Sequence, residues 1–259
     1  MIPPNTVPGD DRGLTLGDGL FETLLARDGE LVMFEAHLAR MDAGCLALDL
    51  PAPDPEEALR LCKAVAGPGR MAVRLTLTAG SGGRGLDRPL QMQPRLFATA
   101  APSLRPETPV SLTTVSVRRN EGSPASRFKT LAYLDQVLAR REASDGEALM
   151  LNNRGEVACA AAANLFWLEE GMLITPALSC GVLNGIMRGR VLAAAARLGL
   201  RALEVAVPRA ALEEAEAIFL TNSLIGLRPV DRLDGKPLGA SSQASARLEA
   251  LKAAIAEVS

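Results

Sequence analysis

Residues 127–134 read Arg-Phe-Lys-Thr-Leu-Ala-Tyr-Leu and place one lysine, Lys129, where a predicted loop meets a predicted helix. The chain has 4 lysines against 24 arginines, so a lysine in mid-chain needs a reason. As a surface side chain it is slightly misplaced, because a cation in the first turn of a helix opposes the helix dipole. As a functional side chain its pKa is expected to be lowered by the apolar Phe128 and the cationic Arg127. A neutral lysine amine can attack an aldehyde.

The composition predicts a folded chain of two domains. Its 259 residues exceed one typical domain and fall short of three, and 48% of them are hydrophobic. The formal net charge of −2 gives no electrostatic reason to expect nucleic acid or an anionic membrane as a partner. Residues 1–5 lack the basic start of a signal peptide, and no stretch approaches 18 apolar residues. We therefore expect a cytoplasmic protein.

Several kinds of chemistry are excluded by missing motifs. His37 is the only histidine, which removes every two-histidine metal motif, and no metal is expected. No Gly-x-Ser-x-Gly elbow or phosphate-binding loop of the GxxxxGK[ST] type is present. The four cysteines lie far apart without a CxxC pair, which argues against a zinc site and a disulfide framework: Cys45, Cys62, Cys159 and Cys180.

Strand and helix patterns alternate along the chain and predict an α+β fold with antiparallel pairing. Residues 1–104 are expected to form a smaller N-terminal α/β domain, residues 105–118 a linker and first strand, and residues 119–259 a larger C-terminal domain that carries Lys129. Strands are expected at 20–25, 30–34, 72–78, 96–101, 110–117, 147–151, 156–160, 164–168, 172–174, 203–207 and 217–221. Helices are expected at 35–48, 55–65, 131–143, 186–198 and 209–214.

The lysine segment, residues 129–139, resembles the cofactor-lysine segment of the fold type IV pyridoxal-phosphate enzymes, the class IV aminotransferase family. This family includes D-amino-acid and branched-chain aminotransferases and 4-amino-4-deoxychorismate lyase. Further blocks agree in the same order: Gly-Asp-Gly-Leu-Phe-Glu-Thr (17–23) followed by His-Leu-Ala-Arg (37–40), Ala-Asn-Leu-Phe-Trp (163–167) followed by Thr-Pro (175–176), and Gly-Val-Leu-Asn-Gly-Ile-Met-Arg (181–188). Together they span nearly the whole chain, so chance agreement is improbable.

The resemblance implies two α/β domains with pyridoxal 5′-phosphate in the cleft between them, bound to Lys129 as a Schiff base, and a homodimer. The implied cofactor-binding residues are Arg40, Lys129, Tyr133, Cys159, Ile186, Met187 and Ser223. Arg40 would pair with the phosphate as a bidentate donor, and the backbone N–H groups of Ile186 and Met187 at a helix start would bind it too. Ser223 would close the phosphate site or be an ordinary turn serine. Tyr133 would approach the cofactor or only pack. Phe21 and Thr23 would contact substrate.

One position departs from the family pattern. A glutamate usually bonds the protonated pyridine nitrogen, and Cys159 stands at that position here. A thiol has a reference pKa near 8.5 and is a weak hydrogen-bond partner, so it cannot hold that proton as a carboxylate does. Glu156 lies three residues away, on the opposite face of a strand, and could substitute only through a bulge or register shift. Transamination is the activity that this change puts most in doubt.

Residues 80–85, Gly-Ser-Gly-Gly-Arg-Gly, resemble the corresponding loop of aminodeoxychorismate lyase, in which Arg84 would pair with a substrate carboxylate. The best hypothesis is therefore a lyase of folate biosynthesis: Lys129 removes a proton, and pyruvate leaves 4-aminobenzoate behind. The nearer alternative is an aminotransferase acting on D- or branched-chain amino acids. The remoter one is a cofactor-binding protein whose catalysis has degenerated.

Overall fold

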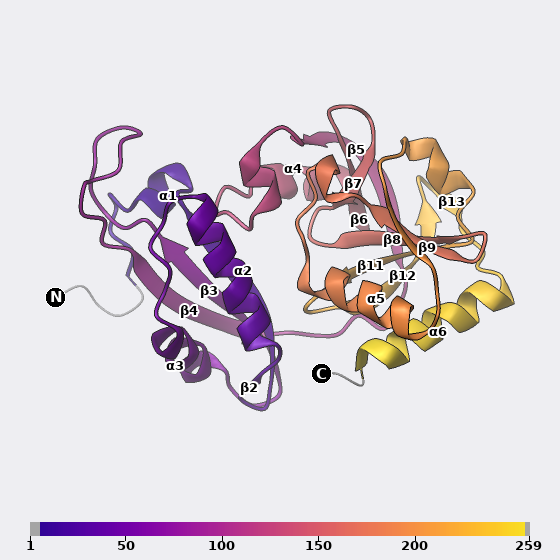
Figure 1. The fold of residues 1–259 in the computed structure, drawn as a ribbon, viewed down its shortest axis with the longest axis horizontal. Coiled ribbons are helices and arrows are strands. Elements are labelled where there is room, and N and C mark those ends of the chain that lie inside the picture. Colours follow the sequence, from indigo (N-terminus) through magenta and orange to yellow (C-terminus); the bar gives the residue numbers. More distant parts are fainter. Residues whose placement is uncertain (1–5, 257–259) are drawn as a thin grey trace. The chain divides into compact units, whose positions relative to one another are not determined.

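The computed structural model describes residues 6–256, which form two compact units (Figure 1). Unit 1 runs to Leu104 and includes the segment Phe128–Tyr133, and unit 2 comprises Arg105–Arg127 and the chain from Leu134 onward. By its contacts, the segment that carries Lys129 belongs to unit 1, although the chain on either side of it belongs to unit 2. The domain boundaries expected from the sequence remain a prediction.

Unit 1 is a four-stranded antiparallel sheet in the order β2-β1-β3-β4 with helices packed on it. Its elements are α1 (Arg12–Leu16), β1 (Gly19–Arg27), β2 (Glu30–Leu31), α2 (Phe34–Ala47), α3 (Pro55–Val65), β3 (Arg70–Thr78) and β4 (Arg95–Pro102). α3 shows why these sequences form helices: Asp54 accepts a hydrogen bond from the N–H of Glu57, and Pro55 fits the first turn, where no N–H is needed.

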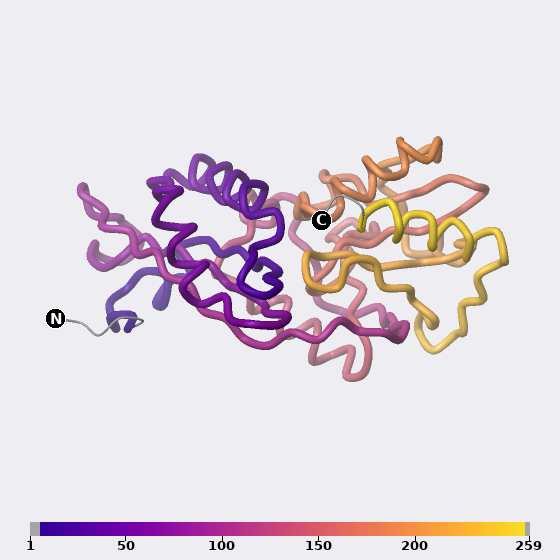
Figure 2. The backbone as a smooth tube through the Cα atoms, turned by 90° about the horizontal axis from the view of Figure 1, so that it is seen from below, coloured from indigo at the N-terminus to yellow at the C-terminus, as the bar shows by residue number. Residues whose placement is uncertain are grey.

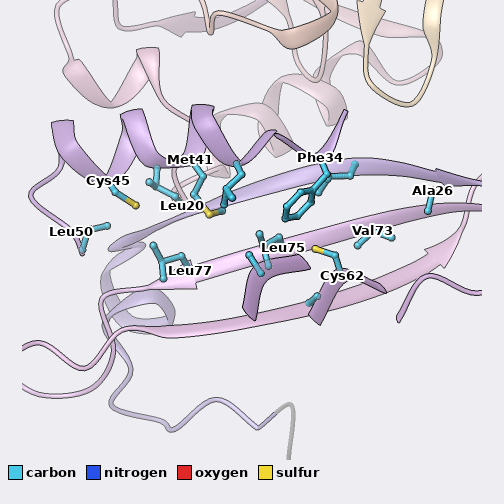
Figure 3. Close-up of a cluster of buried hydrophobic side chains, with 14 of the residues drawn as sticks. Leu20, Ala26, Phe34, Met41, Cys45, Leu50, Cys62, Val73, Leu75 and Leu77 are labelled. Atoms are coloured by element: carbon cyan, nitrogen blue, oxygen red, sulfur yellow. The ribbon is translucent and has the colours of Figure 1, made fainter. Parts of the chain in front are cut away.

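The core of unit 1 lies between the sheet and the helices α2 and α3. Figure 3 shows Phe34 and Met41 of α2 meeting Leu20 of β1 and Leu75 of β3, all of them buried. Alternation along β1 directs Leu20, Glu22 and Leu24 to this face and Phe21 and Thr23 to the other. The two faces of β1 therefore carry different parts of the candidate site.

Unit 2 is built on a nine-stranded mixed sheet in the order β10-β9-β8-β11-β12-β5-β6-β7, with β13 paired to β12. The strands are β5 (Val110–Arg119), β6 (Glu147–Asn152), β7 (Val157–Ala160), β8 (Asn164–Glu169), β9 (Met172–Pro176), β10 (Ala202–Val205), β11 (Ala217–Asn222), β12 (Gly226–Leu233) and β13 (Lys236–Pro237). The helices are α4 (Leu134–Ala143), α5 (Ile186–Arg197) and α6 (Ser242–Ala256), with 3₁₀ turns at Pro124–Arg127, Leu178–Cys180 and Arg209–Glu213. Three strand pairs are parallel, β5 with β6, β5 with β12, and β9 with β10, so antiparallel pairing accounts for most but not all of the sheet.

Helices α5 and α6 cover one face of the unit 2 sheet (Figure 1). Figure 2 traces the same backbone from below. Val191 and Leu251 of these helices belong to the same buried cluster as Phe166 and Phe219 of the sheet. The rings of Phe166 and Phe219 are stacked with centroids 5.2 Å apart. This packing fixes the start of α5, which carries the phosphate site expected from the sequence. No helix within residues 6–256 has the length and apolar character needed to cross a bilayer.

The structure corrects several of the expected elements. The helix expected from residue 131 begins at Leu134, because residues 129–131 pair with β1 instead. The strand expected at 30–34 is limited to Glu30–Leu31, since Phe34 already begins α2. The periodicity did not reveal α1, β12, β13 or α6.

Candidate active site

The lysine segment pairs with β1 through an isolated antiparallel bridge between Thr130 and Leu20. The N–H of Phe21 donates to the carbonyl of Lys129 at 2.9 Å, and the N–H of Leu131 donates to the carbonyl of Gly19 at 3.0 Å. A Cβ at position 19 would lie 2.3 Å from the carbonyl oxygen of Leu77 and 2.7 Å from the side chain of Leu131. Gly19 therefore lacks a side chain so that the lysine segment can approach, and this pairing places Lys129 on the face of Phe21.

An aromatic and cationic cluster surrounds the Lys129 amine. Its Nζ lies 4.2 Å from the ring centroid of Phe21 and 3.4 Å from the hydroxyl oxygen of Tyr133. The two rings meet edge to face with centroids 5.0 Å apart. Arg74 of β3 covers Phe21, with its Cζ 3.6 Å from the ring centroid. Cations over aromatic faces are attracted by the ring quadrupole, so Phe21 holds both cations in place.

This environment gives Lys129 the properties of a base. Burial lowers the pKa of Lys129 to about 8; the nearby Glu22 opposes this change, and the positive charges of Arg40 and Arg74 add to it. A lysine with an ordinary pKa is almost entirely protonated at neutral pH. Lys129 instead has an appreciable neutral fraction, which is the form that attacks a carbonyl or accepts a proton.

The opposite face of β1 carries a buried ionic group that joins Glu22 to α2. The carboxylate of Glu22 accepts hydrogen bonds from Arg40 Nε at 2.7 Å and Nη2 at 2.5 Å. It is also 2.7 Å from His37 Nδ1. Burial alone would raise the pKa of Glu22, but the hydrogen bonds from His37 and Arg40 outweigh it and lower that pKa below its ordinary value. Glu22 is therefore an anion within the core.

The glycine-rich loop, residues 80–85, is fastened to α1 by a buried arginine. Arg12 donates to the carbonyls of Leu86 and Asp87 at 2.9 and 3.0 Å and pairs with Asp18 at 2.9 Å. At Gly83, whose φ is +79°, a Cβ would lie 2.2 Å from the carbonyl oxygen of Asp87. Within this loop, the side chain of Arg84 is exposed to solvent.

In unit 2, α5 begins after a glycine cap. Gly185 precedes the helix and supplies no capping side chain, so no side chain at the cap accepts the first N–H groups, which include those of Ile186 and Met187. A Cβ at Gly185 would lie 2.0 Å from Asn164 Oδ1, and Asn164 Nδ2 donates to the carbonyl of Leu183 at 2.9 Å. Asn164 thus fixes the turn that leads into the helix.

A second polar turn presents Ser223. Asn222 Oδ1 accepts hydrogen bonds from the N–H groups of Leu224 and Ile225, both at 2.9 Å, and its Nδ2 donates to the carbonyl of Ala162. The side chain of Asn222 therefore fixes the backbone on both sides of Ser223, which is half-buried.

Cys159 lies on β7 opposite Met150, next to a register shift in the pairing with β6. Burial raises the pKa of the Cys159 thiol, the nearby Arg119 opposes that change, and Glu147 adds to it, so the group is a neutral thiol at neutral pH. The carboxylate of Glu156 accepts from Asn152 Nδ2 at 2.6 Å and from Arg154 Nε at 3.0 Å. Both donors share Oε2, so this oxygen of Glu156 is held within its own turn.

Some of the predicted residues lie together, and others are separate. Lys129, Tyr133 and Phe21 form one cluster in unit 1, and Thr23 lies on the same face of β1. The other predicted residues of unit 1 are Arg40 on the opposite face and Arg84 on the loop; Cys159, Ile186, Met187 and Ser223 belong to unit 2.

Sequence reasoning missed Glu22 and Arg74. Glu22 carried a detectable signal, because it is a charged residue at an apolar-face position between Leu20 and Leu24. Arg74 carried no such signal. It lies over Phe21 because the register of β1 and β3 places Arg74 opposite Thr23, and the sequence does not reveal that register.

The residues present fit pyridoxal phosphate at the aldehyde and phosphate ends. A lysine with a pKa of about 8 suits attachment through an aldehyde. In unit 1 an arginine, and in unit 2 a helix start without a capping side chain, are each groups of the kind that bind a phosphate dianion. The pyridine end has a neutral thiol as the predicted partner instead of a carboxylate. Within residues 6–256, no group of three or more metal-ligating side chains is present.

Comparison with known proteins gives one consistent family. The family model described as amino-transferase class IV matches residues 19–233. A protein of Methanocaldococcus jannaschii named as a branched-chain-amino-acid aminotransferase is 33% identical over 243 residues, which cover 87% of this chain and 82% of that protein. The crystal structure of 4-amino-4-deoxychorismate lyase from Pseudomonas aeruginosa superposes with a TM-score of 0.85 at 32% identity and covers 97% of this chain and 96% of its own. The aminodeoxychorismate lyase of Vibrio harveyi is 28% identical over 238 residues, 88% of each protein.

Proposed function

This chain belongs to the class IV aminotransferase family, and from that premise we propose that it is a 4-amino-4-deoxychorismate lyase, releasing pyruvate and 4-aminobenzoate. It is an enzyme of the lyase or aminotransferase kind, and its cofactor is pyridoxal 5′-phosphate. Lys129 is proposed as the residue that binds the cofactor covalently and moves the proton. Arg40, Ile186, Met187 and Ser223 are proposed to bind its phosphate.

In the proposed reaction, the protein itself has to remove one proton from a carbon atom of the substrate. When bound, the cofactor supplies a sink for the electron pair that remains after a C–H bond breaks. Lys129 supports this role because its neutral amine, 3.4 Å from the Tyr133 hydroxyl, can accept the proton. The C–O bond on the adjacent ring carbon then breaks, the three-carbon fragment leaves as the enol of pyruvate, and the ring becomes aromatic.

We propose elimination rather than transamination because Glu156, the nearest carboxylate in sequence, is hydrogen-bonded elsewhere. Asn152 and Arg154 both donate to Oε2 of Glu156 within its own turn, and we propose that the neutral thiol of Cys159 faces the ring nitrogen. Transamination relies on a strongly electron-accepting ring. Elimination from a substrate that becomes aromatic has its own driving force and tolerates a weaker electron sink.

The proposed substrate carries two carboxylates, and two arginines support its binding. Arg74 covers Phe21 in the Lys129 cluster. Arg84 lies in the loop of residues 80–85, which Arg12 holds through the carbonyl of Leu86. Planar guanidinium groups bind carboxylates through two parallel hydrogen bonds. We propose Arg84 as the ligand of one carboxylate, with Phe21 and Thr23 lining the substrate side of β1.

The test supplies the purified protein with pyridoxal phosphate and aminodeoxychorismate, and measures pyruvate by a coupled dehydrogenase and 4-aminobenzoate by its fluorescence. The proposal expects the two products in equal amounts. The alternative, an aminotransferase, is supported by the relative from Methanocaldococcus jannaschii. Conversion of the cofactor to its amine form by leucine or D-alanine, with no pyruvate from aminodeoxychorismate, would establish that alternative.

We also propose a homodimer located in the cytoplasm. α4 supports the dimer, because Leu134, Val137 and Leu138 lie on one helical face and are 66%, 52% and 40% exposed. Light scattering on a size-exclusion column tests it, and a monomer at micromolar concentration would contradict it.

A further inference from the structure

A buried carboxylate stands in the apolar face of the central strand of unit 1. Glu22 lies between Leu20 and Leu24 on β1, and its side chain is only 1% exposed. An ionised carboxylate in such a place is unfavourable unless each oxygen has a partner. Its presence at this point therefore calls for an explanation beyond packing.

Both oxygens of Glu22 are engaged by α2. Arg40 approaches with its Nε and Nη2 together, at 2.7 and 2.5 Å, which is the bidentate arrangement. His37, three residues before Arg40 on the same helix and 2% exposed, is 2.7 Å from the oxygen that also accepts from Nη2. Two residues of one helix thus hold one carboxylate of the strand.

We propose that Glu22 is a positioning residue that sets the orientation of the Arg40 guanidinium before the cofactor phosphate binds, with His37 holding Glu22 in turn. The inference rests on the proposed role of Arg40 toward the phosphate. An arginine side chain loses most of its rotamer freedom when it is fixed, which opposes binding. If Glu22 fixes Arg40 in the free protein, that loss does not oppose cofactor binding.

The same carboxylate balances the charges around Lys129. The charged groups that act on the Lys129 amine are Glu22 of β1, Arg40 of α2 and Arg74 of β3. The phenol of Tyr133 also lies beside it. Glu22 alone opposes the two guanidiniums. If its charge is removed, the pKa of Lys129 should fall further below 8, while the contact with Tyr133 is kept.

The experiment compares Glu22→Gln with wild type, using Glu57→Gln as a matched control. Glu57 loses the same charge from the same unit, but its side chain is 52% exposed and its pair with Arg60 spans 3.6 Å. Two quantities are measured: the dissociation constant of pyridoxal phosphate, and the pH midpoint of Lys129 modification by an amine reagent in cofactor-free protein, followed by peptide mass spectrometry. The second needs neither cofactor nor turnover.

We expect Glu22→Gln to weaken cofactor binding on the order of tenfold or more, the size of a charge-assisted hydrogen bond, and to lower the midpoint of Lys129. Glu57→Gln should change neither. In an Arg40→Leu background, Glu22→Gln should have little additional effect on the dissociation constant, because Glu22 acts through Arg40. Full additivity would overturn the proposal.

A lower melting temperature of Glu22→Gln with an unchanged dissociation constant and midpoint would also overturn it, since the carboxylate would then serve stability alone. If Glu22→Gln does not fold, Glu22→Asp and His37→Gln replace it, and the same two measurements decide. A wild type that binds no cofactor would refute the roles of Lys129 and Arg40, while the midpoint would still report on Glu22. Lyase or aminotransferase activity does not enter either measurement.

Discussion

The groups that we propose to bind phosphate differ in kind between the two units. Unit 1 uses a side chain, Arg40, held by the buried Glu22. Unit 2 uses backbone N–H groups at the start of α5, where Gly185 leaves room for Asn164. A buried side-chain cation is stable only beside an ionised partner. Backbone N–H groups at a helix start carry no net charge, and the turn before the helix sets their direction. The first site should therefore be sensitive to charge and pH, and the second to shape.

The largest effect is expected from Lys129→Ala, which removes the covalent anchor and leaves both phosphate sites in place. The absorbance band of the lysine-bound cofactor, near roughly 410–430 nm, should disappear completely. Inorganic phosphate should still compete for binding, because Arg40 and α5 remain. Lys63→Ala, which removes an exposed lysine paired with Glu30 at 3.7 Å, should keep the band. A band that survives in Lys129→Ala would assign the anchor to another residue.

The next largest effect is expected from Arg40→Leu, because it removes both guanidinium hydrogen bonds from the buried anion of Glu22 and leaves His37 beside it. Loss of one member of a buried pair costs about 3 kcal/mol or more. We expect a loss of unfolding free energy of about that size in urea titrations, together with weaker cofactor binding. Arg60→Leu breaks an exposed pair and should cost about 0–1 kcal/mol. Equal losses in the two variants would mean that Glu22 is not ionised in the core.

A change of shape should damage the α5 site by a smaller amount. Gly185→Ala places a Cβ 2.0 Å from Asn164 Oδ1, so the turn before the helix must shift. We expect cofactor binding about tenfold weaker, the size of one misplaced hydrogen bond. Gly189→Ala is the matched control within the same helix, since a Cβ there meets nothing within 4 Å. It should raise stability by about 0.5–1 kcal/mol and leave binding unchanged; weaker binding in both variants would refute the argument from shape.

These two sites also differ in how far the sequence could predict them. The start of α5 rests on local signals, a glycine followed by a periodic helix, and the expected start at Ile186 is the observed one. The Arg40 site depends on Glu22, 18 positions earlier, whose pairing requires the packing of α2 on β1. Tyr133 was expected to approach the cofactor or only to pack, one helical turn after Lys129; its hydroxyl oxygen lies 3.4 Å from the Lys129 amine, although the segment between them is not helical. Room at Gly19 lets residues 129–131 pair with β1 and delays the helix to Leu134.

The smallest effect, and the sharpest separation of the two sites, is expected in the pH dependence of stability. The pKa of Glu22 is lowered in the folded state below its ordinary value of 4.5. Its contribution is therefore fully present above that value and is lost as the pH falls through the lower, folded pKa. The difference in unfolding free energy between wild type and Glu22→Gln should be constant near neutral pH and should narrow in acid, because protonated Glu22 resembles glutamine. The difference between wild type and Gly185→Ala should stay flat over the same range, since no titrating group is changed at the helix start. Urea titrations at neutral and acidic pH measure both differences, and a Glu22→Gln difference that widens in acid would show that the carboxylate is protonated in the folded protein at neutral pH.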